Sequence, residues 1–129
     1  MAGRLAWSLL REAIHWVNED IVTAEELDRI IESSMGKRWA YAGPFKSFNM
    51  GGGPGGLRSL LGNVGESVQA CWDDAGKINM GEEWEERVFS QTQKAHREID
   101  LAARDRANRR VLEAATEDKP FVALEADTP

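Results

Sequence analysis

The sequence predicts an all-α fold, and three observations support this prediction. No stretch shows the period-two alternation of β-branched and polar residues that marks a strand. Apolar residues instead recur three and four positions apart, which places them on one face of a helix. Residues 81–115 consist almost entirely of helix-favouring residues and contain no proline.

Residues 4–34 are expected to hold two helices. The apolar residues of the first share one face: Leu5, Leu9, Leu10, Ala13, Ile14 and Val17. The polar run at residues 18–20 breaks this pattern, and Thr23 with Glu26 forms a T-x-x-E capping box that begins a second helix. Its buried stripe is expected to be Leu27, Ile30 and Ile31, with Gly36 as its C-cap.

Residues 36–65 contain nine of the twelve glycines. We expect loop and short helix here, packed by the aromatic residues Trp39, Tyr41, Phe45 and Phe48. A short helical stripe follows at Leu57, Leu60, Leu61 and Val64. From Ser67 the chain is again helical, with Trp84, Val88, Gln91 and Ala95 on one face. Residues 1–115 are expected to form the domain and residues 116–129 an irregular tail.

The run MGGGPGG contains the spacing G-x-G-x-x-G at Gly51, Gly53 and Gly56, and acidic residues follow about 20 positions later. A dinucleotide-binding loop needs a buried strand before the first glycine. The preceding residues, AGPFKSFN, do not read as a strand, and Pro54 removes a backbone donor from the loop. We therefore expect a tight turn that lets two helices meet closely, and no cofactor site in this chain.

Composition limits the classes of function. The formal net charge is −6 at pH 7 and the pI is about 5.0, which argues against a nucleic-acid binder but leaves room for a small anionic ligand held by arginine. Cys71 is the single cysteine, so a reducing compartment is the default. No apolar run approaches a membrane span, and the N-terminal residues are too charged for a signal peptide. These features predict a cytoplasmic domain without membrane contact.

Catalytic and metal motifs are weak. His15 and His96 have no second ligand at a metal spacing, so no metal site is expected. The glutamates at residues 82–86 resemble the acidic first turn of a helix. The segment GKRWAYAGPF is stronger, because Arg38 stands among aromatic residues and a guanidinium binds carboxylate or phosphate in bidentate fashion. The alternative is a surface arginine lying over packed aromatics.

Several motifs occur in a fixed order along RLAWSLLREAIHWVNEDIVTAEELDRIIESSMGKRWAYAGPF. Arg4-Leu5 opens a helix with Arg11-Glu12-Ala13, and VTAEELD begins a second helix. G-x-R-W-A-x-x-G-P-F follows from residue 36, then GG-x-GG at residues 52–56 and ARDRANRRVLEA near the end. From about residue 3 to residue 115, this order resembles the C-terminal domain of the 3-hydroxyacyl-CoA dehydrogenase superfamily. It is most similar to the branch of L-gulonate 3-dehydrogenase (lambda-crystallin) and carnitine dehydrogenase.

The resemblance implies an all-helical domain like the 6-phosphogluconate dehydrogenase C-terminal-like fold. In the family this domain follows an NAD-binding Rossmann domain, forms one wall of the substrate cleft and supplies much of a homodimer interface. It further implies an anionic ligand, a carboxylate or a CoA-type molecule, and a role in fatty acid metabolism. The NAD site would lie on a separate Rossmann domain.

This chain departs from the family in ways that matter for catalysis. The Rossmann domain and the family's catalytic His and Glu are missing, and Gly3 stands where the family usually has Asn. No catalytic residue can therefore be assigned, and the chain alone is not expected to carry out redox chemistry. The resemblance makes Arg38 the candidate contact for an acidic substrate, with Trp39, Pro44 and Phe45 shaping the wall. Alternatively, Gly-Pro starts a helix and Phe45 fills the core.

Three hypotheses remain open from the sequence. The chain is part of a dehydrogenase whose Rossmann domain is separate, or a stand-alone helical dimer that acts as a binding or assembly module, or a repurposed small non-redox enzyme that uses the Arg38 aromatic cleft. A homodimer is expected in each case, because a domain without its Rossmann partner exposes apolar surface. The candidates for that surface are Trp7, Trp16, Trp72 and Trp84. The alternative is that most of them sit in the core.

Overall fold

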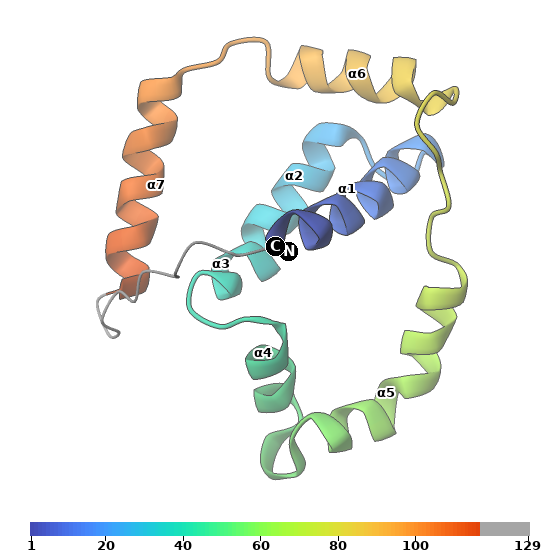
Figure 1. Cartoon of the computed structure of the whole chain (residues 1–129), viewed down its shortest axis with the longest axis vertical. Coiled ribbons are helices and arrows are strands. Elements are labelled where there is room, and N and C mark those ends of the chain that lie inside the picture. The colour runs from blue at the N-terminus through green and yellow to red at the C-terminus, as the bar shows by residue number, and fades with distance from the viewer. Residues whose placement is uncertain (117–129) are drawn as a thin grey trace. The chain divides into compact units, whose positions relative to one another are not determined.

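The computed structural model describes residues 1–116, and these residues form an all-helical chain, as predicted. Figure 1 shows the helices in order along the chain. They are α1 (Ala2–Asn18), α2 (Ala24–Ser33), α3 (Met35–Trp39), α4 (Pro44–Gly51), the 3₁₀ turn η1 (Gly53–Gly55), α5 (Gly56–Asp73), α6 (Trp84–Ala95) and α7 (Leu101–Thr116). The predicted irregular tail lies outside the described residues, apart from Thr116, which ends α7.

The described residues divide into two compact units. Residues 1–30 and 76–116 form one unit, and residues 31–75 form the other. No helix in the described part of the chain is long and apolar enough to cross a membrane.

The first unit is built around the contact of α1 with α6. The apolar face predicted for the first helix is confirmed in its second half, where Ile14 and Val17 are buried. Trp84, at the start of α6, is 3% exposed and completes this small core. In the first half of α1 the same apolar stripe stays exposed at Leu5, Leu9 and Leu10.

Polar side chains of α6 tie it to the end of α1 and to α2. Arg87 donates to the carbonyl of Asn18 at 2.9 Å, and the amide oxygen of Gln91 accepts the backbone N–H of Ala24 at 2.9 Å. Both bonds satisfy backbone groups that a helix end leaves without an internal partner. One of the two hydrogen bonds of the predicted capping box is confirmed, because Thr23 Oγ1 accepts the N–H of Glu26 at 3.1 Å. The predicted face of α6, which contains Trp84, Val88, Gln91 and Ala95, therefore packs inward as expected. Gln91 caps the start of α2 through its side chain.

The second unit is built around the packing of α4 against α5 across the glycine turn. Gly56 has φ 64°, a conformation that other residues rarely adopt. A Cβ there would lie 2.5 Å from Asn49 Oδ1, which accepts the N–H of Leu57 at 2.8 Å. The prediction of a tight turn between two close helices is confirmed, and α5 is much longer than the short helix that we expected.

Two sequence predictions about this unit are wrong. Gly36 is not a C-cap, because α2 ends at Ser33 and Gly36 lies inside α3. The glycine is needed for another reason, since a Cβ there would approach the carbonyl oxygen of Ile31 to 2.7 Å. The aromatics do not pack the unit either. Trp39, Tyr41, Phe45 and Phe48 are all exposed, while the small residue Ala42 is buried.

Candidate functional site

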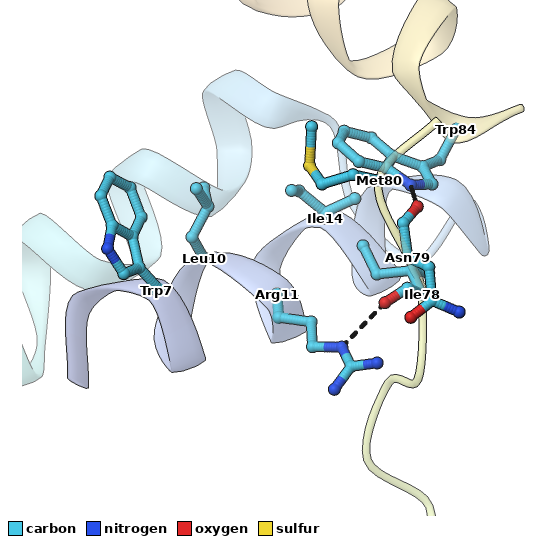
Figure 2. A pocket seen from close by; sticks show the side chains of 8 residues that line it. All are labelled: Trp7, Leu10, Arg11, Ile14, Ile78, Asn79, Met80 and Trp84. Atoms are coloured by element: carbon cyan, nitrogen blue, oxygen red, sulfur yellow. Dashed lines mark hydrogen bonds between the residues drawn. The ribbon is translucent and has the colours of Figure 1, made fainter. Parts of the chain in front are cut away.

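A groove lies in the first unit, between α1 and the segment that leads into α6. Its volume is about 430 Å³, within the usual range for ligand pockets. Figure 2 shows its lining: Trp7, Leu10, Arg11, Ile14, Ile78, Asn79, Met80 and Trp84. Most of these side chains are apolar, and Trp7 (68% exposed) and Met80 (78% exposed) leave the groove open to solvent. We call it the α1–α6 groove.

Hydrogen bonds to the backbone hold residues 76–80 against α1. Glu12 Oε2 accepts the N–H of Gly76 at 2.8 Å, and Arg11 Nε donates to the carbonyl of Ile78 at 2.9 Å (Figure 2). Gly76 passes so close to the His15 side chain that a Cβ would collide with it. This part of the wall has no regular secondary structure, so its shape depends on these bonds.

The other end of the segment is held by Trp84, the first residue of α6, and by Glu82 just before it. Trp84 Nε1 donates to the carbonyl of Asn79 at 2.7 Å, and the N–H of Asn79 bonds to the carboxylate of Glu82. The Trp84 ring therefore packs in the core, and its indole N–H holds the groove wall at Asn79. Edge-to-face contact with Phe89, at 5.8 Å between ring centroids, further orients the ring.

The chemistry of the groove suits binding rather than catalysis. Arg11 is the single charged residue in its lining, and there is no nucleophile paired with a base. Among residues 1–116, no group of three His, Cys, Asp or Glu side chains could hold a metal ion. The groove can hold an apolar segment, and Arg11 places a positive charge at the edge of the groove.

The sequence-predicted site residues lie elsewhere, in the second unit. Arg38 and Trp39 end α3, and Pro44 and Phe45 begin α4. All four are exposed, and Phe45 is 78% exposed, so the idea that it fills the core is wrong. Pro44 is the first residue of α4, which confirms that Gly-Pro starts a helix.

A tight turn joins these two pairs of residues. The carbonyl of Arg38 accepts the N–H groups of Tyr41 and Ala42, at 3.1 and 2.9 Å. Ser47 Oγ donates to the carbonyl of Ala42 at 3.3 Å. The backbone of the G-x-R-W-A-x-x-G-P-F motif is therefore fixed, while its cationic and aromatic side chains face solvent.

Sequence reasoning missed the wall of the groove and one contact between two side chains. Ile78 and Met80 lie in a segment without helical periodicity, so no local sequence pattern predicts that they line a groove. His96 Nε2 lies 2.7 Å from Asp28 Oδ2, a pairing between residues far apart in the chain that local spacing could not reveal. Of the four tryptophans proposed for the surface, Trp7 and Trp72 are exposed, whereas Trp84 is buried and Trp16 half-buried.

The comparison with protein families agrees with this architecture. Residues 1–79 match the model of the 3-hydroxyacyl-CoA dehydrogenase C-terminal domain, which is more than half of the chain. The matched range covers α1 to α5 and ends inside the groove wall, at Asn79. The chain belongs to this family.

Similar proteins include several L-carnitine dehydrogenases. The chain is 39% identical to that of Oceanobacillus iheyensis over 89 residues, which cover 69% of this chain and 29% of the relative. It is 31% identical to that of Pseudomonas putida over 106 residues, covering 82% of this chain and 33% of the relative. That of Staphylococcus epidermidis is 40% identical over 72 residues, or 56% of this chain and 22% of the relative. The chain thus spans a third or less of these relatives.

Proposed function

We propose that this chain provides the helical, substrate-binding and dimerising domain of an NAD-dependent dehydrogenase that acts on a 3-hydroxy acid or its CoA thioester. The family match over residues 1–79 is the observation that carries this proposal. The NAD-binding domain would be a separate Rossmann domain. The matched segments cover 29% and 33% of two relatives.

The names of the relatives suggest a substrate class. L-Carnitine combines a carboxylate, a 3-hydroxyl group and a quaternary ammonium group. Arg38 would bind the carboxylate, because a guanidinium stays charged and offers paired donors. Exposed faces of Trp39 and Phe45 would suit the ammonium group through cation–π contact, with Pro44 holding Phe45 at the start of α4. A 3-hydroxyacyl-CoA thioester is the other proposed substrate, and it would place the enzyme in fatty acid metabolism.

The chemical step would take place on the cofactor that the separate domain binds. This chain's residues would bind and orient the substrate, and they would exclude water from one side of it. A reducing compartment such as the cytoplasm suits the chain, because Cys71 is its single cysteine and is exposed.

Exposed apolar surface supports the dimerising role. In the described part of the chain, large hydrophobic residues are exposed at 22 positions, while four hydrophobic residues are buried: Ile14, Val17, Ala42 and Trp84. A monomer rarely keeps so much apolar surface in water. We therefore propose a homodimer, which size-exclusion chromatography with light scattering would test.

Affinity capture from the native cell tests the dehydrogenase proposal. The tagged chain should retain a near-stoichiometric protein that carries a glycine-rich βαβ dinucleotide-binding unit, which mass spectrometry would identify. Recovery of the chain as a dimer without any such protein would contradict the proposal. That result would favour the second candidate, a helical dimer that acts as a binding module through the α1–α6 groove.

A further inference from the structure

We infer that the α1–α6 groove is a ligand site of its own, which binds a linear aliphatic carboxylate with its alkyl chain in the groove and its carboxylate on Arg11. The inference goes beyond the proposed function, because the groove lies in the first unit and Arg38 lies in the second. The groove volume, about 430 Å³, is in the lower part of the range for small-molecule pockets. A small ligand therefore fits it, and the charge and shape of the lining select the kind of ligand.

Arg11 carries a charge that no carboxylate in the described part of the chain neutralises. The neighbouring Glu12 is not its partner, because the two oxygens of Glu12 accept the N–H groups of Trp16 and Gly76. Close contacts between basic and acidic side chains within residues 1–116 involve other basic residues: Arg29, Arg87, His96 and Arg104. A guanidinium of this kind, at the edge of an apolar groove, is complementary to an anionic group.

The Arg11 side chain is fixed at one nitrogen and keeps two others for a ligand. Nε donates to the carbonyl of Ile78 at 2.9 Å (Figure 2). The terminal nitrogens Nη1 and Nη2 make no hydrogen bond to residues 1–116. Their donors lie in one plane, which suits paired bonds to a carboxylate. Because the Nε bond already orients the side chain, binding costs little further side-chain freedom.

The apolar part of the lining suits an alkyl chain. Trp7, Leu10 and Ile14 lie three and four positions apart on α1, so they form one continuous face (Figure 2). From Trp7 to Ile14 this face is about 10 Å long, at a rise of about 1.5 Å per residue. Met80 lies on the other wall, and its unbranched thioether side chain adapts to the shape of a neighbour. An alkyl chain of medium length matches this face.

Acidic side chains near the start of α6 leave the positive charge of the lining in place. The carboxylates of Glu82 and Glu85 bond to the backbone N–H groups of Asn79 and Gly81. None of the glutamates at residues 82–86 belongs to the lining, in which Arg11 is the charged residue. The charge of the groove therefore favours an anionic ligand over a cationic one.

Indole N–H signals in nuclear magnetic resonance spectra locate a bound ligand. Trp7, Trp39 and Trp72 are exposed, so Trp7→Phe, Trp39→Phe and Trp72→Phe assign their signals without loss of the fold. Isotope-labelled protein is then titrated with decanoate. The Trp7 signal should shift and saturate with a dissociation constant of about 1 mM or lower, and the Trp72 signal should not move. A shift of the Trp39 signal without the Trp7 signal, or no saturable shift, overturns the inference.

Two further ligands separate charge from apolar contact. Decyltrimethylammonium has the same chain with the opposite charge, and it should bind at least about 10-fold more weakly than decanoate, as for loss of a charged hydrogen bond. Octanoate has two fewer methylenes and should bind about 5- to 15-fold more weakly, since each buried methylene contributes about fourfold. Equal binding of the two decyl ligands overturns the role of Arg11. Equal binding of the two carboxylates overturns the role of the apolar face.

Variants of three arginines complete the test. Arg11→Gln should raise the dissociation constant of decanoate at least about 10-fold and should not weaken binding of decyltrimethylammonium. An equal loss for both ligands shows that Arg11 only supports the wall, which overturns the inference. Arg58→Gln, on α5, and Arg38→Ala should leave decanoate binding unchanged. Loss of binding in Arg38→Ala would place the ligand at the proposed substrate site instead. Failure of any of these tests leaves the dehydrogenase proposal standing, because that proposal is tested by capture of a dinucleotide-binding partner.

Discussion

Glu12 Oε2 accepts the backbone N–H of Gly76 at 2.8 Å, across 64 residues of chain. Its other oxygen, Oε1, accepts the indole N–H of Trp16 at 2.9 Å. The Glu12 carboxylate thus bonds both to a side chain of its own helix and to the first residue of the segment 76–80. The groove wall depends on this anchor, because residues 75–79 have no regular secondary structure of their own.

Removal of this carboxylate should destabilise the first unit. Glu12→Ala leaves two part-buried N–H groups without an acceptor, so we expect a loss of about 1–3 kcal/mol in the free energy of unfolding. Urea denaturation followed by circular dichroism measures it. Glu19→Ala removes an exposed carboxylate at the end of the same helix and should change stability by less than about 0.5 kcal/mol. Equal losses in the two variants would show that Glu12 is no anchor.

Trp84 should be the most sensitive tryptophan of the chain. Trp84→Ala leaves a cavity in a small core and removes the bond to the carbonyl of Asn79, so we expect a loss of about 3–5 kcal/mol. Trp72→Ala, at a position that is 65% exposed on α5, serves as the control and should cost far less. Thermal unfolding midpoints compare the two, and a similar fall in both would argue against the core described here.

Two glycines should respond in opposite ways to alanine. Gly76→Ala places a Cβ against the His15 side chain and should destabilise the first unit by about 1–3 kcal/mol. Gly62 lies within α5 with open space around it, so Gly62→Ala should stabilise its helix by up to about 1 kcal/mol. The same urea titration measures both, and a stabilising Gly76→Ala would refute the close passage of residue 76 beside α1.

Arg38 should act on substrate binding in the reconstituted enzyme. Arg38→Ala removes the proposed contact with the carboxylate, so KM for an acidic substrate should rise by about 10- to 100-fold, as for loss of a charged hydrogen bond of about 1.5–3 kcal/mol. Arg58→Ala, an exposed arginine on α5, is the matched control and should leave KM unchanged. A KM that is insensitive to Arg38→Ala would remove this residue from the proposed site.

Periodicity predicted the helices well and the groove poorly. The faces of α1 and α6 follow from residues three and four apart, because those residues meet the same neighbour when a helix packs. The groove wall follows from bonds such as Arg11 to Ile78, which join residues 67 apart and leave no local pattern. The aromatic residues near Arg38 were expected to be packed because they are apolar, but the unit that contains them buries little beyond Ala42.

The most direct test of the central claim is NADH formation by the reconstituted pair. L-Carnitine and NAD⁺ are supplied to the chain alone, to the captured dinucleotide-binding partner alone and to an equimolar mixture. We predict activity in the mixture only, because the proposed function assigns substrate binding and cofactor binding to different domains. NADH formation by the chain alone, or none by the mixture with L-carnitine or a 3-hydroxyacyl-CoA, would contradict the account.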